Sequence, residues 1–342
     1  MTSSPTDVAS FIAALPKAEL HVHLVGSASI PTVLDLSRRR PESGVPTGEA
    51  ALRTFYEFTD FAHFIDVYIA VNSLVVSGED IETLVVGLAR DLASQNVRYA
   101  EVTVTPHSHL RAGIPAVDVV AGLAAGRRRA HTEHGVQLNW IHDIPSELGP
   151  ESGLATAAFV LDHAPEGTVA FGLGGPEVGW PRELFKQSFD QARAAGLHSA
   201  PHAGETTGPE SVWSAIRNLG AERIGHGINA VRDSRLLDYL AEHRIPLEVC
   251  PTSNVRTMSV PSLAEHPLPR LLDAGVTVTL NTDDPGMFHT TLNREYEIAH
   301  ETFGLGPTEL AELARNAARV AFCDDATREK LLAEIDAVAA GA

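Results

Sequence analysis

The chain has 342 residues, of which 44% are hydrophobic and 20% charged, proportions that exclude extensive disorder and fit one large α/β barrel or two average domains. Its formal net charge of −18 disfavours binding to nucleic acid or to an anionic membrane surface. Two cysteines exclude a disulfide framework, and no apolar run reaches the ~20 residues that span a bilayer. The first residues show no signal-peptide pattern, so a cytoplasmic location is expected.

Short apolar runs rich in β-branched residues alternate with longer amphipathic stretches along the chain. Eight runs predict strands, namely Ala18–Leu24, Arg98–Val104, Gln137–His142, Val169–Leu173, Leu197–His202, Arg223–His226, Pro246–Cys250 and Val276–Asn281. Helical periodicity predicts helices over Asp80–Gln95, Ala116–His134, Pro181–Ala195, Val212–Leu219, Arg235–His243 and Pro267–Ala274.

The repeated order of strand and helix predicts an α/β fold, a (β/α)₈ TIM-type barrel with extra helices between strands 1 and 2 and at the C-terminus. We expect this barrel to form a single domain over residues 1–342. A doubly wound open sheet is the alternative architecture. The segment Arg39–Gly48, rich in Pro and Gly, predicts a loop rather than a domain linker.

Between the first two strands, four phenylalanines recur every three residues. Phe55, Phe58, Phe61 and Phe64 are typical of an aromatic stripe that faces the core. The alternative is an apolar lid over the strand ends that keeps bulk water out of a site.

The end of the first strand carries His21-Val22-His23. Residues two apart in a strand point to the same side, so both imidazoles project together and form half of a metal site. His202, His226 and Asp283 also lie at or just past predicted strand ends. Those ends converge on one face of a parallel barrel, so we expect these residues to meet there. Nitrogen and carboxylate ligands without thiolates suit Zn²⁺ or another borderline divalent ion.

A second His-x-His, His107-Ser108-His109, follows Pro106 after strand 2. It is expected to lie in a loop. Neither histidine has matching ligand partners in the sequence, so a role beside the site or at the surface is favoured.

Together these segments resemble the signature motifs of the adenosine deaminase family. The motifs occur in family order: His21-Val-His-Leu, His202-Ala-Gly-Glu205, Gly225-His226-Gly227, Glu248-Val-Cys-Pro251 and Asn281-Thr-Asp-Asp-Pro285. The helix-rich tail with Asn316-Ala-Ala is also similar. The resemblance implies a (β/α)₈ barrel with one Zn²⁺ per chain, which deaminates a 6-aminopurine nucleoside by hydrolysis.

The resemblance also implies roles for single residues. His21, His23, His202 and Asp283 would bind the zinc ion, whose bound water attacks C6 of the purine. Glu205 resembles the family's proton donor to N1. His226 resembles its water-orienting base and is not counted as a ligand.

Two further positions resemble the family's contacts to the purine base. Asp284 would contact N7, and the backbone amide of Gly175 would meet N3. Taken singly, each motif has a structural alternative: His226 can cap a turn, Glu205 can favour a helix start, and Asp283-Asp284-Pro285 is a common turn sequence.

One departure from the family pattern concerns the sugar. Adenosine-specific members carry a carboxylate that accepts a hydrogen bond from the ribose 5′-hydroxyl, where this chain has Val25. Valine cannot accept that bond, and a buried hydroxyl without a partner costs ~1–3 kcal/mol. Thr103 replaces a frequent Arg and Gly172 a frequent Asp, which opens space or removes charge near the strand ends.

These changes favour an adenine nucleoside modified at its 5′ position. The Val25-Gly-Ser continuation resembles deaminases of 6-amino-6-deoxyfutalosine, an intermediate of one menaquinone route, and 5′-methylthioadenosine is another candidate. The futalosine skeleton bears a benzoate, which predicts a cation in the site. The sequence does not identify that Lys or Arg.

Other functions stay open as alternatives. They are an adenosine or deoxyadenosine deaminase proper, a non-catalytic nucleoside-binding relative, and a barrel hydrolase of phosphoesters or amides. The last often uses two metals and a bridging Lys, and no Lys occurs in the strand-end segments. The His-x-Glu and Pro-Cys-x-x-Cys signature of nucleic-acid deaminases is missing from the sequence. A small-molecule partner is therefore expected, with no nucleic acid or membrane, and the oligomeric state is not predicted.

Overall fold

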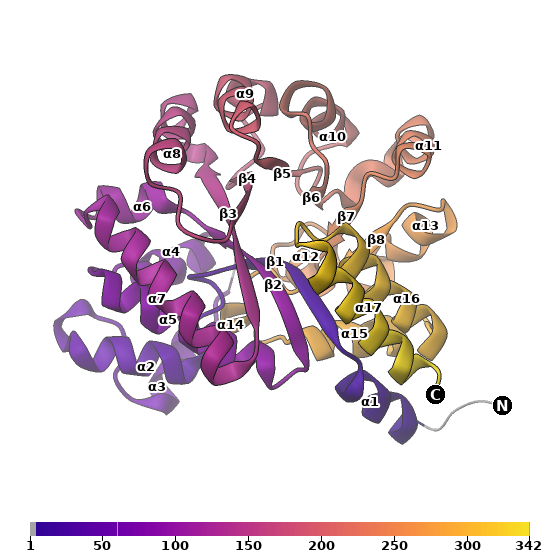
Figure 1. The fold of residues 1–342 in the computed structure, drawn as a ribbon, viewed down its shortest axis with the longest axis horizontal. Coiled ribbons are helices and arrows are strands. Elements are labelled where there is room, and N and C mark those ends of the chain that lie inside the picture. Colours follow the sequence, from indigo (N-terminus) through magenta and orange to yellow (C-terminus); the bar gives the residue numbers. More distant parts are fainter. Residues whose placement is uncertain (1–4, 60, 342) are drawn as a thin grey trace.

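The computed structural model of the protein describes residues 5–59 and 61–341, and its centre is a parallel sheet of eight strands. Each strand pairs with the next one in the sequence, so that the spatial order is the chain order from β1 to β8 (Figure 1). The strands are β1 (Lys17–His23), β2 (Val97–Val104), β3 (Gln137–Pro145), β4 (Thr168–Gly174), β5 (His198–Ala203), β6 (Ile224–His226), β7 (Leu247–Val249) and β8 (Val278–Leu280). All eight predicted strands are confirmed, with ends that differ by a few residues.

The sheet closes into a barrel between its first and last strands. Val22 and Asp283 form a parallel bridge just beyond β8. The backbone N–H of His23 donates to the Asp283 carbonyl, and the N–H of Asp283 donates to the His21 carbonyl, both at 2.9 Å. This closure confirms the predicted barrel over the open sheet. It also places two predicted ligand segments on the closing seam.

Helices surround the strands in a ring (Figure 1). Within the described residues, four α-helices lie between β1 and β2 and four follow β8, in the two places where the sequence predicts extra helices. The helices are α1 (Pro5–Ala14), α2 (Ile30–Arg39), α3 (Glu49–Phe55), α4 (Phe61–Asn72), α5 (Gly78–Ala93), α6 (Pro106–Arg111), α7 (Ala116–His134), α8 (Pro150–His163), α9 (Lys186–Ala194), α10 (Pro209–Ser214), α11 (Ser234–His243), α12 (Pro251–Arg256), α13 (Leu268–Asp273), α14 (Pro285–Phe288), α15 (Leu292–Glu301), α16 (Pro307–Val320) and α17 (Asp325–Ala339). No helix within the described residues is both long and apolar enough to span a bilayer.

Three local differences from the predicted elements have physical causes. The helix expected over Pro181–Ala195 begins as a 3₁₀ turn, Arg182–Phe185, because Arg182 turns inward to donate to backbone carbonyls. The stretch expected as Val212–Leu219 ends in a π-helical segment, Ala215–Leu219. The expected loop at His107-Ser108-His109 is instead the short helix α6, which Pro106 starts at its first position.

The barrel interior is polar toward the C-terminal ends of the strands. Along β1, Ala18, Leu20 and Val22 belong to the hydrophobic core, while Glu19 and His21 are buried polar residues that alternate with them. A small apolar cluster of Ile141, Ala170 and Ala200 lies apart from the main core, and Phe322 packs against it. Buried polar side chains occur at both ends of the strands, with Lys17 and Arg223 at strand starts. His21 lies toward the C-terminal ends, where barrel active sites form.

The four phenylalanines do not share one helix face. Phe55 ends α3, Phe58 lies in the connection, and Phe61 begins α4, with its side chain outside the described part of the structure. Phe64 is buried, and its ring lies 5.2 Å from Phe58 and 5.0 Å from Phe288. Phe288 follows β8, so this aromatic cluster belongs to the core and also lies near the strand ends, as the lid alternative expects.

Candidate metal centre and active site

The four predicted ligands meet at the C-terminal end of the barrel. His21 and His23 come from β1, His202 from β5, and Asp283 follows β8. One nitrogen or oxygen atom from each lies within 4.8 Å of all the others. All but His23 are buried, and the His23 side chain is only 14% exposed.

The distances between these atoms fit a shared ion. Nε2 of His23 lies 3.2 Å from Nε2 of His202 and 3.3 Å from Oδ1 of Asp283, and Nε2 of His21 lies 3.6 Å from the same oxygen. Ligands ~2.0–2.1 Å from a tetrahedral zinc are about 3.3 Å apart. Nε2 of His21 is buried and has no hydrogen-bond partner among the described residues. Such an atom needs a partner, and a cation at the centre of the group would supply one.

The electrostatics of the group suit a divalent cation. Burial lowers the pKa of His23 to about 4, and burial with the neighbouring imidazoles lowers that of His202 well below its usual value. Burial would raise the pKa of Asp283, but the nearby imidazoles, His21 first among them, hold it well below its ordinary range. Two neutral imidazoles and a carboxylate are therefore ready to coordinate a metal.

A carboxylate behind His21 fixes the orientation of its ring. Oε2 of Glu248, on β7, lies 2.8 Å from Nδ1 of His21. A proton on Nδ1 leaves the lone pair of Nε2 directed at the ligand group. Burial alone would lower the pKa of His21, but the nearby carboxylates of Asp283 and Glu248 outweigh burial and raise that pKa. Glu248 in turn pairs with the buried Arg223, which also pairs with Glu101 inside the barrel.

The backbone at two site residues is unusual. His226 and Asp283 have φ values of 59° and 66°, a left-handed conformation that is uncommon outside glycine. Ser253, in α12, donates a 2.6 Å hydrogen bond to Oδ2 of Asp283. The other carboxylate oxygen, Oδ1, remains directed at His21 and His23.

Glu205 and His226 lie together beside the ligand group. Nε2 of His226 is 3.6 Å from Oε2 of Glu205 and 3.8 Å from Oδ2 of Asp283. Its other nitrogen, Nδ1, lies 3.1 Å from the side-chain amide of Asn254. Oε1 of Glu205 accepts hydrogen bonds from Thr257 at 3.0 Å and from Ser259 at 3.3 Å. One oxygen of Glu205 is thus anchored, and the other faces His226.

The loop that carries Glu205 is held by a second glutamate, Glu177. Its carboxylate accepts hydrogen bonds from three successive backbone N–H groups, those of Gly204, Glu205 and Thr206, at 2.7 to 2.8 Å. The hydroxyls of Thr207 and Ser211 donate to it as well. Burial would raise the pKa of Glu177, but these hydrogen bonds outweigh it and lower that pKa to about 2.

Gly175 and Asp284 flank the same face. Gly175 has a φ of 77°, and a Cβ there would lie 2.5 Å from Oε2 of Glu147. The left-handed backbone at this position therefore favours glycine, independently of any purine. Asp284 is 7% exposed, and its Oδ1 is buried without a hydrogen-bond partner among the described residues. That carboxylate occupies the space of a Cβ at Gly26.

Val25 lies in the turn after β1 and is 6% exposed. The space at Gly172 is not open, contrary to the expectation from sequence. A Cβ there would lie 2.7 Å from Oδ1 of Asp143, a buried residue of the neighbouring strand β3. At Gly172, where the family often has Asp on β4, the nearby space is therefore occupied by the carboxylate of Asp143 on β3.

Sequence reasoning assigned no role to several residues that contact the site. Asp143 gave no signal, because a lone aspartate in a strand pattern has no motif. Glu177 follows Gly-Gly-Pro at the end of β4, a position that could have marked it. The remaining contact residues are Glu248, Ser253, Asn254, Thr257 and Ser259, all from β7, α12 and the residues after it.

Comparison with known proteins covers nearly the whole chain. The family model described as adenosine deaminase matches residues 16–338. A curated relative from Streptomyces avermitilis, named aminodeoxyfutalosine deaminase, is 53% identical over 96% of this chain and 93% of its own length.

Two solved structures are also similar. Adenine deaminase from Arthrobacter aurescens has a TM-score of 0.90 and 31% identity, covering 95% of this chain and 99% of its own. An amidohydrolase from Burkholderia ambifaria with bound Zn has a TM-score of 0.89 and 28% identity, covering 100% of this chain and 96% of its own.

Proposed function

The chain belongs to the adenosine deaminase family, and we propose that it hydrolyses the 6-amino group of 6-amino-6-deoxyfutalosine, an adenine nucleoside extended at its 5′ carbon. This reaction belongs to one route of menaquinone biosynthesis. Residues 1–342 would act as one metal-dependent hydrolase domain in the cytoplasm.

The observation that carries the choice of substrate is Val25. It occupies the position after His23-Leu24 where adenosine-specific members offer a carboxylate to the ribose 5′-hydroxyl. A free 5′-hydroxyl facing this buried valine would lose its partner. A nucleoside with carbon at that position loses nothing, and the 53% identity to an aminodeoxyfutalosine deaminase supports the same substrate.

His21, His23, His202 and Asp283 would hold one Zn²⁺, which their separations and the orphaned Nε2 of His21 fit. When bound, zinc activates a water molecule for attack at neutral pH. The zinc in a related amidohydrolase supports this choice of metal.

Two residues would move or orient protons. Glu205, anchored through Oε1, would donate a proton to N1 of the purine while C6 gains its new bond to oxygen. His226, whose Nδ1 faces Asn254, would use Nε2 to orient the attacking water. In the net reaction, the oxygen of water becomes the 6-oxo group. One of its protons ends on N1, and the other leaves with the amino group as ammonia.

Asp284 and Gly175 would fix the purine. Burial raises the pKa of Asp284, so its unpartnered carboxyl would be protonated and would donate to N7. The backbone N–H of Gly175 would donate to N3. Two contacts, on different edges of the purine, would hold C6 in a single orientation.

A steady-state panel tests the substrate. We expect ultraviolet absorbance to show a higher kcat/KM for 6-amino-6-deoxyfutalosine than for 5′-methylthioadenosine or adenosine. A kcat/KM for adenosine that equals or exceeds both would contradict the proposal and favour an adenosine deaminase proper. Binding without any spectral change would favour the non-catalytic alternative.

A further inference from the structure

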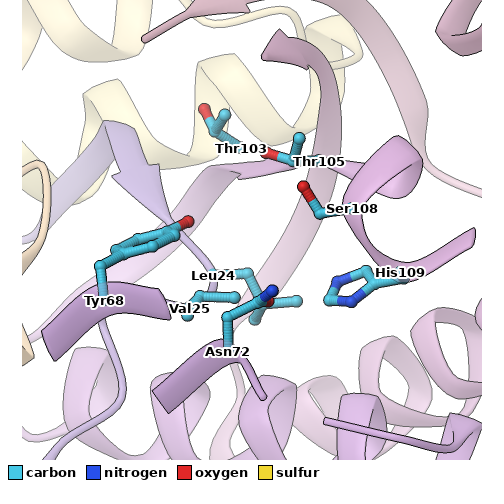
Figure 2. Close-up of a pocket in the computed structure, with 8 residues that line it drawn as sticks. All are labelled: Leu24, Val25, Tyr68, Asn72, Thr103, Thr105, Ser108 and His109. Carbon is cyan, nitrogen blue, oxygen red and sulfur yellow. The ribbon is translucent and has the colours of Figure 1, made fainter. Parts of the chain in front are cut away.

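A small recess lies beside Val25, between the ends of β1 and β2 and the helices α4 and α6. Figure 2 shows side chains from these elements arranged around one space above Leu24 and Val25. Its volume is about 10 Å³, close to the space that one water molecule requires. The polar side chains that line it are Tyr68, Asn72, Thr103, Thr105, Ser108 and His109.

Several of these polar side chains make no hydrogen bond within the described part of the chain. No hydrogen bond joins the side chain of Asn72, Thr103 or Ser108 to any described residue. Thr105 precedes α6 at the capping position, where threonine usually bonds the first helical turn, yet its side chain makes no capping bond. His109 is 3% exposed, and its Nδ1 is buried without a partner among the described residues. Asn72, Thr105 and Ser108 are half-buried, so their side chains are open to a ligand or to water, whereas the buried Nδ1 of His109 needs a partner. Their convergence on one space marks a place where a polar ligand group could bind.

The recess offers donors that carry no charge. No Lys, Arg, Asp or Glu lines it. Burial lowers the pKa of His109 to about 4, so its imidazole is neutral near pH 7. Hydroxyls, an amide and a neutral imidazole together can donate several hydrogen bonds to one anionic group, and bonds to an ionised acceptor are the strong ones.

The position of the recess suits the far end of a 5′ substituent. Val25 lines it, and Val25 is the residue that the proposed function places near the 5′ carbon. Its volume, close to that of one water molecule, admits one carboxylate oxygen and not an aromatic ring. Leu24, Val25 and the ring of Tyr68 would therefore face the ring of the substituent, and only its carboxylate would enter.

We propose that this recess binds the aryl carboxylate of the 5′ substituent, chiefly through Thr105, Ser108 and Asn72. The proposal rests on the proposed function. It replaces the cation expected from the sequence with uncharged donors.

A cation elsewhere at the barrel mouth is the competing site. Arg256, at the end of α12, lies over the ring of Phe58 at 4.3 Å and has no ion pair with a described residue. It belongs to the aromatic cluster of Phe58, Phe64 and Phe288, rather than to the recess beside Val25.

The test compares 6-amino-6-deoxyfutalosine with an analogue whose benzoate is replaced by phenyl. In the unaltered protein, we expect kcat/KM to favour the carboxylated compound. Ser108→Ala and the near-isosteric Thr105→Val should each lower that ratio about tenfold, the usual effect of removing one bond to a charged group. Ser73→Ala makes the same change on the exposed side of the chain after α4, and should leave the ratio unaltered. Thermal unfolding checks that each variant folds.

Several outcomes would overturn the subsite. A ratio unaltered in both Ser108→Ala and Thr105→Val would do so, as would a ratio lost in Arg256→Gln alone, which would assign the carboxylate to the arginine. If the unaltered protein prefers adenosine to both compounds, the proposed function itself fails. A failure of the proposed function can be told apart from a failure of the subsite, because it is measured on the unaltered protein before any variant is made.

Discussion

Glu205 has a clear division between its two carboxylate oxygens, one bonded to Thr257 and the other facing His226. Glu205→Gln keeps the shape and the hydrogen-bond acceptor but removes the transferable proton. We expect kcat to fall about 100-fold or more, with fold and metal content unaltered. The absorbance assay and metal analysis check this together. Full activity in the variant would remove Glu205 from the mechanism.

Val25 is the residue on which the choice of substrate depends. Val25→Asp restores an acceptor for a 5′-hydroxyl, worth ~1–3 kcal/mol. We therefore expect the ratio of kcat/KM for adenosine to that for 6-amino-6-deoxyfutalosine to rise roughly fivefold or more. Val25→Ala adds space without an acceptor and should not raise it. An equal rise in both variants would mean that steric room, rather than hydrogen bonding, sets the preference.

Among single residues, those in the motifs could be predicted from the sequence. The residues that pack against them or bond to them could not. His21, His23, His202 and Asp283 are found from sequence because strand periodicity and strand ends place them. Asp143 could not be found, since its carboxylate fills the space at Gly172 only after two strands pair.

Among the structural elements, the connection after β5 is held in place by the carboxylate of Glu177. The pKa of this carboxyl is about 2 in the folded protein against about 4.5 when free, because buried hydrogen bonds favour its charged form. A lowered folded-state pKa gives stability that is complete above pH 4.5 and is lost as pH falls toward 2. The shift corresponds to about 3 kcal/mol.

Glu177→Gln should therefore lower the free energy of unfolding at pH 7, and its difference from the unaltered protein should shrink between pH 4.5 and 2. Denaturant unfolding of both proteins without metal measures this, since metal loss at low pH would otherwise contribute. A difference that stays constant across that range would show that Glu177 does not act through its charge.

Elements were predictable where one pattern dominates. The eight strands follow from apolar runs at regular spacing. Helix α8 (Pro150–His163) is not among the predicted helices, although it lies between β3 and β4 as the barrel requires. The 3₁₀ turn at Arg182–Phe185 and the π-helical segment at Ala215–Leu219 depend on tertiary contacts, which periodicity does not report.

The first and last strands of the barrel meet where the predicted metal ligands lie. The four residues come from β1, β5 and the end of β8, so a metal would link both ends of the sheet across its closing seam. An ion that binds only the folded state stabilises it by mass action. We expect removal of the metal to lower the Tm by several degrees, and zinc to restore it. In His21→Ala, added zinc should raise the Tm much less; an equal rise would assign the ion to another site.

Closure of the barrel could be anticipated from eight alternating strands and helices. The particular residues that pair where the first and last strands meet could not. The bond from the His23 N–H to the Asp283 carbonyl joins residues far apart in the chain, and no local pattern encodes it.

The central claim is that three histidines and one aspartate hold a single zinc ion for deamination. Anomalous scattering from crystals, recorded on both sides of the zinc edge, tests it most directly. The account predicts one peak bonded to Nε2 of His21, His23 and His202 and to Oδ1 of Asp283. A zinc peak bound by other residues, or none in active protein, would contradict it.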